Sequence, residues 1–366
     1  MRIRTSLLFS GFIIILILLA GCTEDTPNTV SPGTGSAAGA GPAGIRAGVA
    51  AMDSILPSTY LQFANLDVTY IDFELTNPTG TARTVVVESE VPGFTEKAIN
   101  TVEVPAYGNV TVGQTPMLRT GAIPAEVKTA ALHYKVSLAD GTRIDEQTYP
   151  VKVFPKDTMV WEVKDGDEEY DMAQYIAAWV TPHAAVIDPL MRKAAEYHPE
   201  KSIAGYQCGE SCSEREWADY SNAQVKAIFT ALKNDYRITY INSPIAFGSG
   251  GDNPQRVRLP KDAIAANSAN CIDGTVLYAS ALESIGMNPH IIILPTHAFV
   301  CYDTKPDAEG ITCIETTMTG SATFEEAVAA AEEEYQEEIT NGNFRSGASR
   351  DYSLAELRAE GILPME

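Results

Sequence analysis

The sequence predicts an α+β protein in which a β-rich region precedes a region of mixed helices and strands. From about residue 57 to 155, short runs of alternating apolar and polar residues are separated by turn residues, which is typical of half-buried strands. From residue 157 onward, apolar residues recur at helical spacing. Short apolar runs typical of buried strands follow the helical segment that begins at Cys271. A chain of 366 residues is long enough for two such domains and a tail.

Residues 1–22 are predicted to be an export signal. Arg2 and Arg4 precede an apolar run of 14 residues, Leu7 to Ala20, which is short for a membrane span. The sequence Leu-Ala-Gly-Cys that ends at Cys22 resembles a lipoprotein cleavage site and implies lipidation of the Cys22 sulfur. The alternative is an uncleaved signal anchor. Both place the chain outside the cell, tethered to the outer face of the cytoplasmic membrane.

Residues 23–52 are rich in Thr, Pro, Gly, Ser and Ala, a composition that cannot bury a core. We expect a flexible tether there. The formal net charge of the whole chain is −22. Because phosphate binding requires clustered Lys and Arg, this charge argues against a nucleic-acid partner.

Residues 53–156 are predicted to form a β-sandwich domain. Strands of similar length with frequent turn residues are typical of an immunoglobulin-like sandwich. The expected strands are Asp67 to Leu75, Arg83 to Glu88, Ile99 to Val104, Val110 to Gln114, Val127 to Leu138 and Arg143 to Phe154. This domain shows no chemically reactive cluster, so we expect it to act in spacing or binding.

Residues 157–366 contain a cysteine, a histidine and a carboxylate in the order that thiol hydrolases use. Cys271 begins a segment with helical spacing that ends at Gly286. In the first turn of a helix, the unpaired N–H groups and the dipole favour an anion such as a thiolate. His297 follows after 297 − 271 = 26 residues and Glu315 after 315 − 297 = 18 residues.

The two later residues are expected on paired strands. His297 to Tyr302 and Ile311 to Thr317 have the pattern of a hairpin. If His297 pairs with Glu315, the two side chains share one face of the hairpin. A carboxylate there would fix the imidazole tautomer and stabilise the imidazolium that forms when the thiol loses its proton.

This arrangement resembles the transglutaminase-like superfamily, whose fold is papain-like. The resemblance covers roughly residues 157–319 and is strongest from Gln255 onward. It implies Cys271 as nucleophile, His297 as base and Glu315 as the orienting acid, with no cofactor and no metal. The family usually has Asp as the third residue. Animal crosslinking enzymes have Trp after the nucleophile, where this chain has Ile272, which weakens an inference of protein crosslinking.

Further helices are expected before and after the three residues. Ser213 and Glu216 form a capping box that predicts a helix start. The other expected helices are Tyr170 to Trp179, Ala184 to Tyr197, Thr323 to Ile339, and Tyr352 to Leu363 within the C-terminal part.

Four more residues are weaker site candidates. Tyr240 is a candidate oxyanion donor, with a packed tyrosine as the alternative. Gln255, Arg256 and Arg258 are candidates for binding an acidic substrate, with exposed surface residues as the alternative.

Five cysteines remain once the lipidated one is set aside. Cys208 and Cys212 are either a local disulfide or two reduced cysteines. Cys301 and Cys313 are expected to be packed core residues that form no bridge. Cys271 is left as a free thiol, as a nucleophile requires.

The sequence therefore predicts a cell-surface, cysteine-dependent acyl-transfer enzyme. We expect it to hydrolyse a peptide, protein or other amide substrate through a thioester, as a peptidase or amidase, with acyl transfer to an amine as an open alternative. A different reading is a non-catalytic surface binding or scaffold module with the same fold, including an inactive relative.

Overall fold

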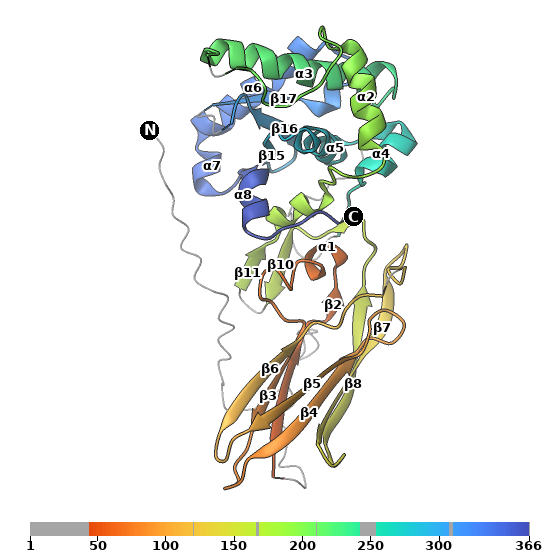
Figure 1. The fold of residues 1–366 in the computed structure, drawn as a ribbon, viewed down its shortest axis with the longest axis vertical. Coiled ribbons are helices and arrows are strands. Elements are labelled where there is room, and N and C mark those ends of the chain that lie inside the picture. Colours follow the sequence, from red (N-terminus) through yellow and green to blue (C-terminus); the bar gives the residue numbers. More distant parts are fainter. Residues whose placement is uncertain are drawn as a thin grey trace, which may run out of the picture. The chain divides into compact units, whose positions relative to one another are not determined.

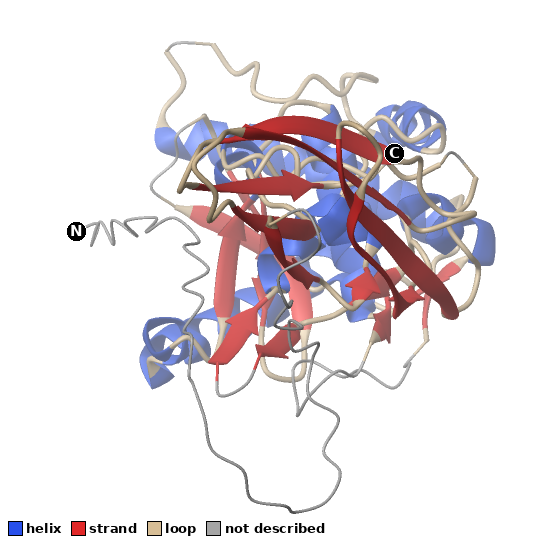
Figure 2. Cartoon of the chain, turned by 90° about the horizontal axis from the view of Figure 1, so that it is seen from below, coloured by secondary structure: helices blue, strands red, loops and turns tan. Residues whose placement is uncertain are grey.

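The computed structural model describes residues 44–119, 121–165, 168–209, 211–241, 254–306 and 310–365. Over these residues the chain is an α+β protein with several sheets (Figure 1, Figure 2). The expected signal segment, Cys22 and most of the expected tether lie outside the described residues. Within the described residues, no helix has the length and apolarity needed to cross a membrane.

Two sheets enclose the first hydrophobic core. One has the strand order β1-β3-β6, and the other has the order β2-β8-β7-β4-β5. Their strands are β1 (Arg46–Ala51), β2 (Ser54–Ile55), β3 (Ile71–Thr76), β4 (Arg83–Glu90), β5 (Ala98–Val104), β6 (Asn109–Gln114), β7 (Lys128–Leu138) and β8 (Arg143–Val153), with the short helix α1 (Pro57–Tyr60) after β2. Alternate residues of both sheets, including Phe73, Leu75, Val85 and Val136, are fully buried in one cluster. The alternation therefore places one face of each sheet in a shared core.

Strand β1 lies partly where the sequence predicted a flexible tether. It pairs antiparallel with β3 from Arg46 to Ala51, and Ala47 is buried. The prediction of a tether through residue 52 is wrong for this segment. Its small residues resemble a linker in composition, yet an edge strand gains its stability from backbone pairing and needs few large side chains.

The second core surrounds helix α5. A four-stranded antiparallel sheet has the order β17-β16-β15-β18, and α5 packs against β15 and β16. The helices here are η1 (Ala173–Trp179, a 3-10 helix), α2 (Ile187–Tyr197), α3 (Glu214–Asn234), α4 (Pro260–Ala266), α5 (Cys271–Ser284), η2 (Thr316–Met318), α6 (Phe324–Asn341), α7 (Asn343–Ser346) and α8 (Leu354–Ala359). The strands are β9 (Thr158–Met159), β10 (Glu162–Asp165), β11 (Glu168–Asp171), β12 (Thr239–Tyr240), β13 (Gln255–Arg256), β14 (Ser268–Ala269), β15 (Pro289–Ile293), β16 (Ala298–Asp303), β17 (Ile311–Ile314) and β18 (Arg350–Ser353).

Helix α5 begins and ends where its sequence signals predict. The Asn270 side chain accepts a hydrogen bond from the Asp273 N–H, and the Asp273 carboxylate accepts one from the Asn270 N–H, which completes a capping box. Gly286, with φ +74°, follows the end of the helix. Every residue from 271 to 282 is buried, so α5 is held by packing on all sides.

Two expected helices near this core are shorter than predicted. The segment from Tyr170 to Trp179 contains the end of β11 and then the 3-10 helix η1. The segment from Tyr352 to Leu363 contains the end of β18 and then α8. In both cases a sheet edge is available nearby, and strand pairing there overrides the weak helical periodicity of a short segment.

The hairpin of β16 and β17 is paired two residues away from the expected register. Cys301 lies opposite Cys313, where the prediction placed Cys301 opposite Ile311. A shift of two residues preserves which face each side chain occupies. The observed register brings the two cysteines together, and they form a disulfide. The expectation that they are packed residues without a bridge is therefore wrong. Cys208 and Cys212 are also joined by a disulfide, with Cα atoms 6.2 Å apart.

Removing the hairpin disulfide is expected to destabilise the protein by about 3 kcal/mol, because it closes a loop of about a dozen residues in the unfolded chain. The measurement is urea unfolding of the Cys301→Ala/Cys313→Ala variant without reductant. The Cys208→Ala/Cys212→Ala variant is the control, with an expected loss of about 2 kcal/mol because its loop is shorter. An unchanged free energy of unfolding in the hairpin variant would contradict this prediction.

Candidate active site

Cys271 is the first residue of α5 and the one free cysteine among the described residues. At this position its backbone N–H has no partner within the helix, and the helix dipole favours negative charge on the sulfur. The Cys271 carbonyl accepts a hydrogen bond from the Thr275 hydroxyl at 2.8 Å, which lies within the same helix. The side chain is fully buried.

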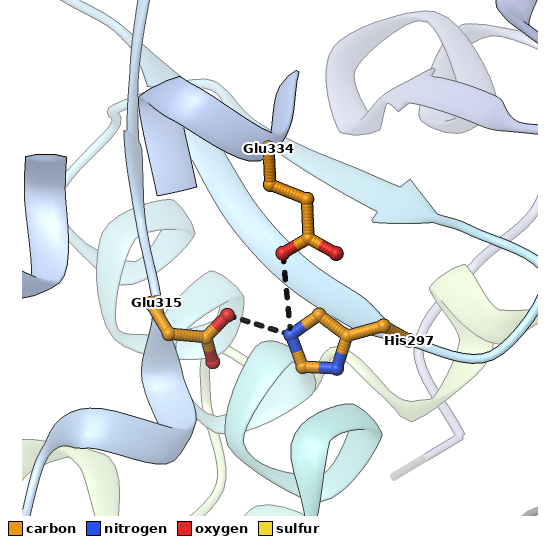
Figure 3. A group of neighbouring side chains, drawn as sticks. All are labelled: His297, Glu315 and Glu334. Carbon is orange, nitrogen blue, oxygen red and sulfur yellow. Dashed lines mark hydrogen bonds and ion pairs between the residues drawn. The ribbon is translucent and has the colours of Figure 1, made fainter. Parts of the chain in front are cut away.

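His297 links Cys271 to Glu315. The imidazole Nε2 lies 2.6 Å from Glu315 Oε2 (Figure 3), and the Cys271 side chain interacts with the ring and raises its pKa. Since Nε2 faces the carboxylate, the nitrogen that remains for the thiol is Nδ1. The structure thus brings together the three residues that the sequence singled out, although neither His297 nor Glu315 lies within the paired part of the hairpin.

Glu315 is fixed by the turn that follows β17. Its second carboxylate oxygen, Oε1, accepts hydrogen bonds from the N–H of Thr317 at 2.8 Å and from the hydroxyl of Thr317 at 2.6 Å. The carboxylate caps η2 with one oxygen and holds the imidazole with the other. Because Glu315 is 6 % exposed, this orientation is set inside the protein.

The environment of His297 favours its protonated form. Burial of the ring lowers its pKa. The hydrogen bonds to Cys271 and Glu315 and the charges of both groups raise it by more, so that the pKa of His297 is raised to about 10. The imidazolium is therefore the form that the fold stabilises at neutral pH, as a thiolate–imidazolium pair requires.

We expect the His297 ring to titrate near pH 10 in the folded protein. Its pKa is raised relative to the unfolded chain, so its contribution to stability is complete below about pH 6.5 and is lost as the pH rises through about 10. NMR titration of the ring proton signals, assigned by comparison with His297→Gln, measures the midpoint. Cys271→Ala should lower it, because one hydrogen bond to the imidazolium is lost. A wild-type midpoint near 6.5 would refute the prediction.

A second carboxylate lies beside the same imidazole. Glu334 Oε2, from α6, is 3.9 Å from His297 Nε2 (Figure 3). Burial raises the pKa of Glu334, while the nearby His297 lowers it and Glu315 raises it. Glu334 could not be identified from the sequence, because a glutamate in a run of acidic helix residues carries no signal of its own.

Glycine is required at position 274 by the close approach of η2 to α5. A Cβ atom there would lie 2.7 Å from Thr316 Oγ1 and 3.0 Å from Thr316 Cβ. The backbone of η2 can therefore pack against the first turn of α5. This packing positions Glu315, at the start of η2, near the helix end that carries Cys271. A hydrogen bond between the hydroxyl groups of Tyr278 and Thr319, at 2.9 Å, also joins α5 to this turn.

Tyr240 lies at the edge of the site. It is 40 % exposed, and β12, which carries it, contacts η2. Burial raises the pKa of Tyr240, and the charges of Cys271 and Glu315 raise it further. The position is consistent with the expected oxyanion donor, and that role stays a prediction.

The three residues expected to bind an acidic substrate have structural partners. Arg256 forms an ion pair with Asp157. Arg258 donates hydrogen bonds to the carbonyl and hydroxyl of Ser268. Gln255 is buried and accepts a hydrogen bond from the Trp161 indole at 2.7 Å. The expected role of the three residues in binding a substrate stays a prediction.

Comparisons with known proteins give no family for this chain. No protein-family model matches the sequence, and no curated protein matches it. Among solved structures, complexes of two variants of the exo-chitosanase CsxA from Amycolatopsis orientalis with PNP-β-D-glucosamine are similar at 13 % identity, with TM-scores of 0.21 and 0.19. The alignments cover 62 % and 58 % of this chain but only 32 % and 28 % of the chitosanase chains. Likeness at this level carries no argument about fold or function.

Proposed function

We propose that this protein is a thiol-dependent hydrolase of amide bonds, with Cys271 as nucleophile, His297 as general acid–base and Glu315 as the residue that orients the imidazole. One observation supports this most directly: His297 is hydrogen bonded to Glu315 and interacts with Cys271, which is the first residue of a buried helix. A structural cysteine needs neither the charged histidine nor the buried carboxylate behind it.

In the proposed reaction the Cys271 thiolate attacks the carbonyl carbon of an amide. The backbone N–H of Cys271 stabilises the negative charge on the carbonyl oxygen, since it lies at a helix N-terminus. The C–N bond then breaks as the imidazolium of His297 gives its proton to the leaving amine, and a thioester remains. Water attacks this thioester, His297 accepts a proton from the water, and the C–S bond breaks to release the carboxylic acid.

The proposed class of fold follows from the same residues. A cysteine at the head of a buried helix and a histidine and an acid at the ends of neighbouring strands resemble the transglutaminase-like, papain-like arrangement. The first two sheets fit an immunoglobulin-like sandwich in having two layers around one core. We further propose, from the first 22 residues, export and attachment to the outer face of the membrane.

A second candidate function is a non-catalytic surface module, and one observation favours it. Cys271 is 0 % exposed, so a carbonyl carbon reaches its sulfur only after neighbouring side chains move. A protein that keeps the fold for binding needs no such movement. The two functions therefore differ in whether Cys271 forms a covalent bond with an acyl group.

The deciding experiment exposes the purified full-length chain to a library of peptides and simple amides. We expect release of free amine and a mass increase on Cys271 that mild hydroxylamine removes, as it does for thioesters. The matched control is Cys271→Ala, which keeps the helix and removes the sulfur. If the native chain and this control give the same products throughout the library, the binding module is the better account.

A further inference from the structure

The side chains around His297 contain a set of ligands for a metal ion. His297 Nε2, one oxygen of Glu315 and one oxygen of Glu334 all lie within 4.8 Å of one another (Figure 3). They come from three separate places in the chain: the residue before β16, the residue after β17, and α6. Segments distant in sequence thus direct one imidazole nitrogen and two carboxylate oxygens toward a common point.

We propose that His297, Glu315 and Glu334 bind a divalent transition-metal ion such as Zn²⁺. Imidazole and carboxylate are preferred ligands of this ion, with bonds of about 2.0 to 2.2 Å and tetrahedral geometry. Such bonds separate neighbouring ligand atoms by about 3.3 Å. The separations of Nε2 from the two oxygens, 2.6 Å and 3.9 Å, lie on either side of that value.

The change in ligand spacing that Zn²⁺ requires is small, and the more exposed ligand, Glu334, can make it. Glu315 Oε1 is held by Thr317, so Oε2 is already directed at the imidazole. The Glu334 side chain is 37 % exposed, and among the described residues it forms an ion pair with His297. A rotation of this side chain brings its oxygen closer, and solvent can occupy the fourth position of the ion.

The two carboxylates make the site selective for cations. Together they carry two negative charges beside one imidazole, and no lysine or arginine among the described residues forms an ion pair with either of them. A divalent ion neutralises both charges at once. Cys271 is not one of the residues whose ligand atoms lie within 4.8 Å of one another at this point.

Metal binding would also affect the proposed catalysis, and this consequence rests on the proposed function. An imidazole bound to the ion through Nε2 can give up its Nδ1 proton only by becoming an imidazolate. Proton donation to the leaving amine is then disfavoured, so the ion is expected to inhibit hydrolysis reversibly. Removal of the ion with a chelator should restore the rate.

The test measures Zn²⁺ binding to the full-length chain in a Cys271→Ala background, by competition with a chromogenic chelator at neutral pH. This background has no proposed nucleophile, so the result does not depend on catalysis. We expect Glu334→Gln to weaken binding at least about tenfold. Glu333→Gln removes the same charge from the neighbouring exposed position of α6 and should change the affinity less than about twofold.

Equal Zn²⁺ affinity in the Glu334→Gln and Glu333→Gln variants would overturn the site. Circular dichroism of both variants shows whether α6 remains folded, and Glu334→Asp provides a second variant that keeps the charge but shortens the ligand. Failure of the proposed hydrolysis is recognised separately, because it leaves the binding difference intact while no amide is cleaved at any Zn²⁺ concentration.

Discussion

Replacing His297 with alanine is expected to lower kcat/KM for amide hydrolysis by about 1,000-fold, the usual range for a general acid–base being about 100- to 10,000-fold. In the proposed mechanism the imidazole receives the thiol proton and returns it to the leaving amine, and the ring interacts with both Cys271 and Glu315. Without the ring, the thiol must ionise unaided and an amine must leave without a proton. Steady-state kinetics on the best substrate from the amide library provides the measurement.

Glu315→Gln separates the orienting role of the carboxylate from the role of its charge. It is expected to lower kcat/KM less, by about tenfold. A glutamine oxygen can still accept a hydrogen bond from the Nε2–H, so the ring keeps its orientation, but the charge that stabilises the imidazolium is lost. Glu333→Gln serves as the control and should leave the rate unchanged. Should His297→Ala retain more than about a tenth of the native activity, the assignment of His297 as the acid–base residue would be wrong.

The second large effect is expected from Gly274→Ala. The added Cβ would meet Thr316 Oγ1 at 2.7 Å and Thr316 Cβ at 3.0 Å, so η2 must move away from α5. Overpacking of this kind costs about 1–3 kcal/mol, while alanine gains about 1 kcal/mol in helix propensity, so the net loss of stability should be modest. Activity should fall about 100-fold, because displacement of Glu315 by about 1 Å misplaces the imidazole.

A matched control and a partial rescue make this prediction specific. Gly209 has no atom within 4 Å of an added Cβ and no positive φ, so Gly209→Ala should be silent. Combining Gly274→Ala with Thr316→Ala removes the closest contact and should recover part of the activity. Strictly additive losses in the double variant would show that the Thr316 contact does not transmit the effect.

The sequence was sufficient to place Cys271 at the start of a helix, but not to place His297 and Glu315 just outside the paired strands. The helix that begins at Cys271 is signalled by its periodicity and by Gly286, and both signals are local. In the structure, the capping box of Asn270 and Asp273 fixes the start of the helix at the same place. Strand faces were also predictable, because a period of two survives a register shift of two residues.

What could not be predicted depends on contacts between distant segments. The disulfide between Cys301 and Cys313 exists because the true register places them opposite each other, and alternation alone cannot distinguish registers that differ by two. Glu334 lies at the site because α6 packs against β17. The sequence of α6 alone does not indicate this packing. The ion pair of Arg256 with Asp157 could not be predicted either, because the two residues are 99 positions apart in the chain.

The account depends above all on whether His297 activates the Cys271 thiol. The most direct measurement is the rate at which iodoacetamide alkylates Cys271 at neutral pH, read by mass spectrometry of the Cys271 peptide in the native chain, in His297→Ala and after unfolding. We predict the highest rate in the folded native chain and a marked fall in His297→Ala. A native rate that is no higher than that of the unfolded chain, and that is unchanged by His297→Ala, would contradict the account.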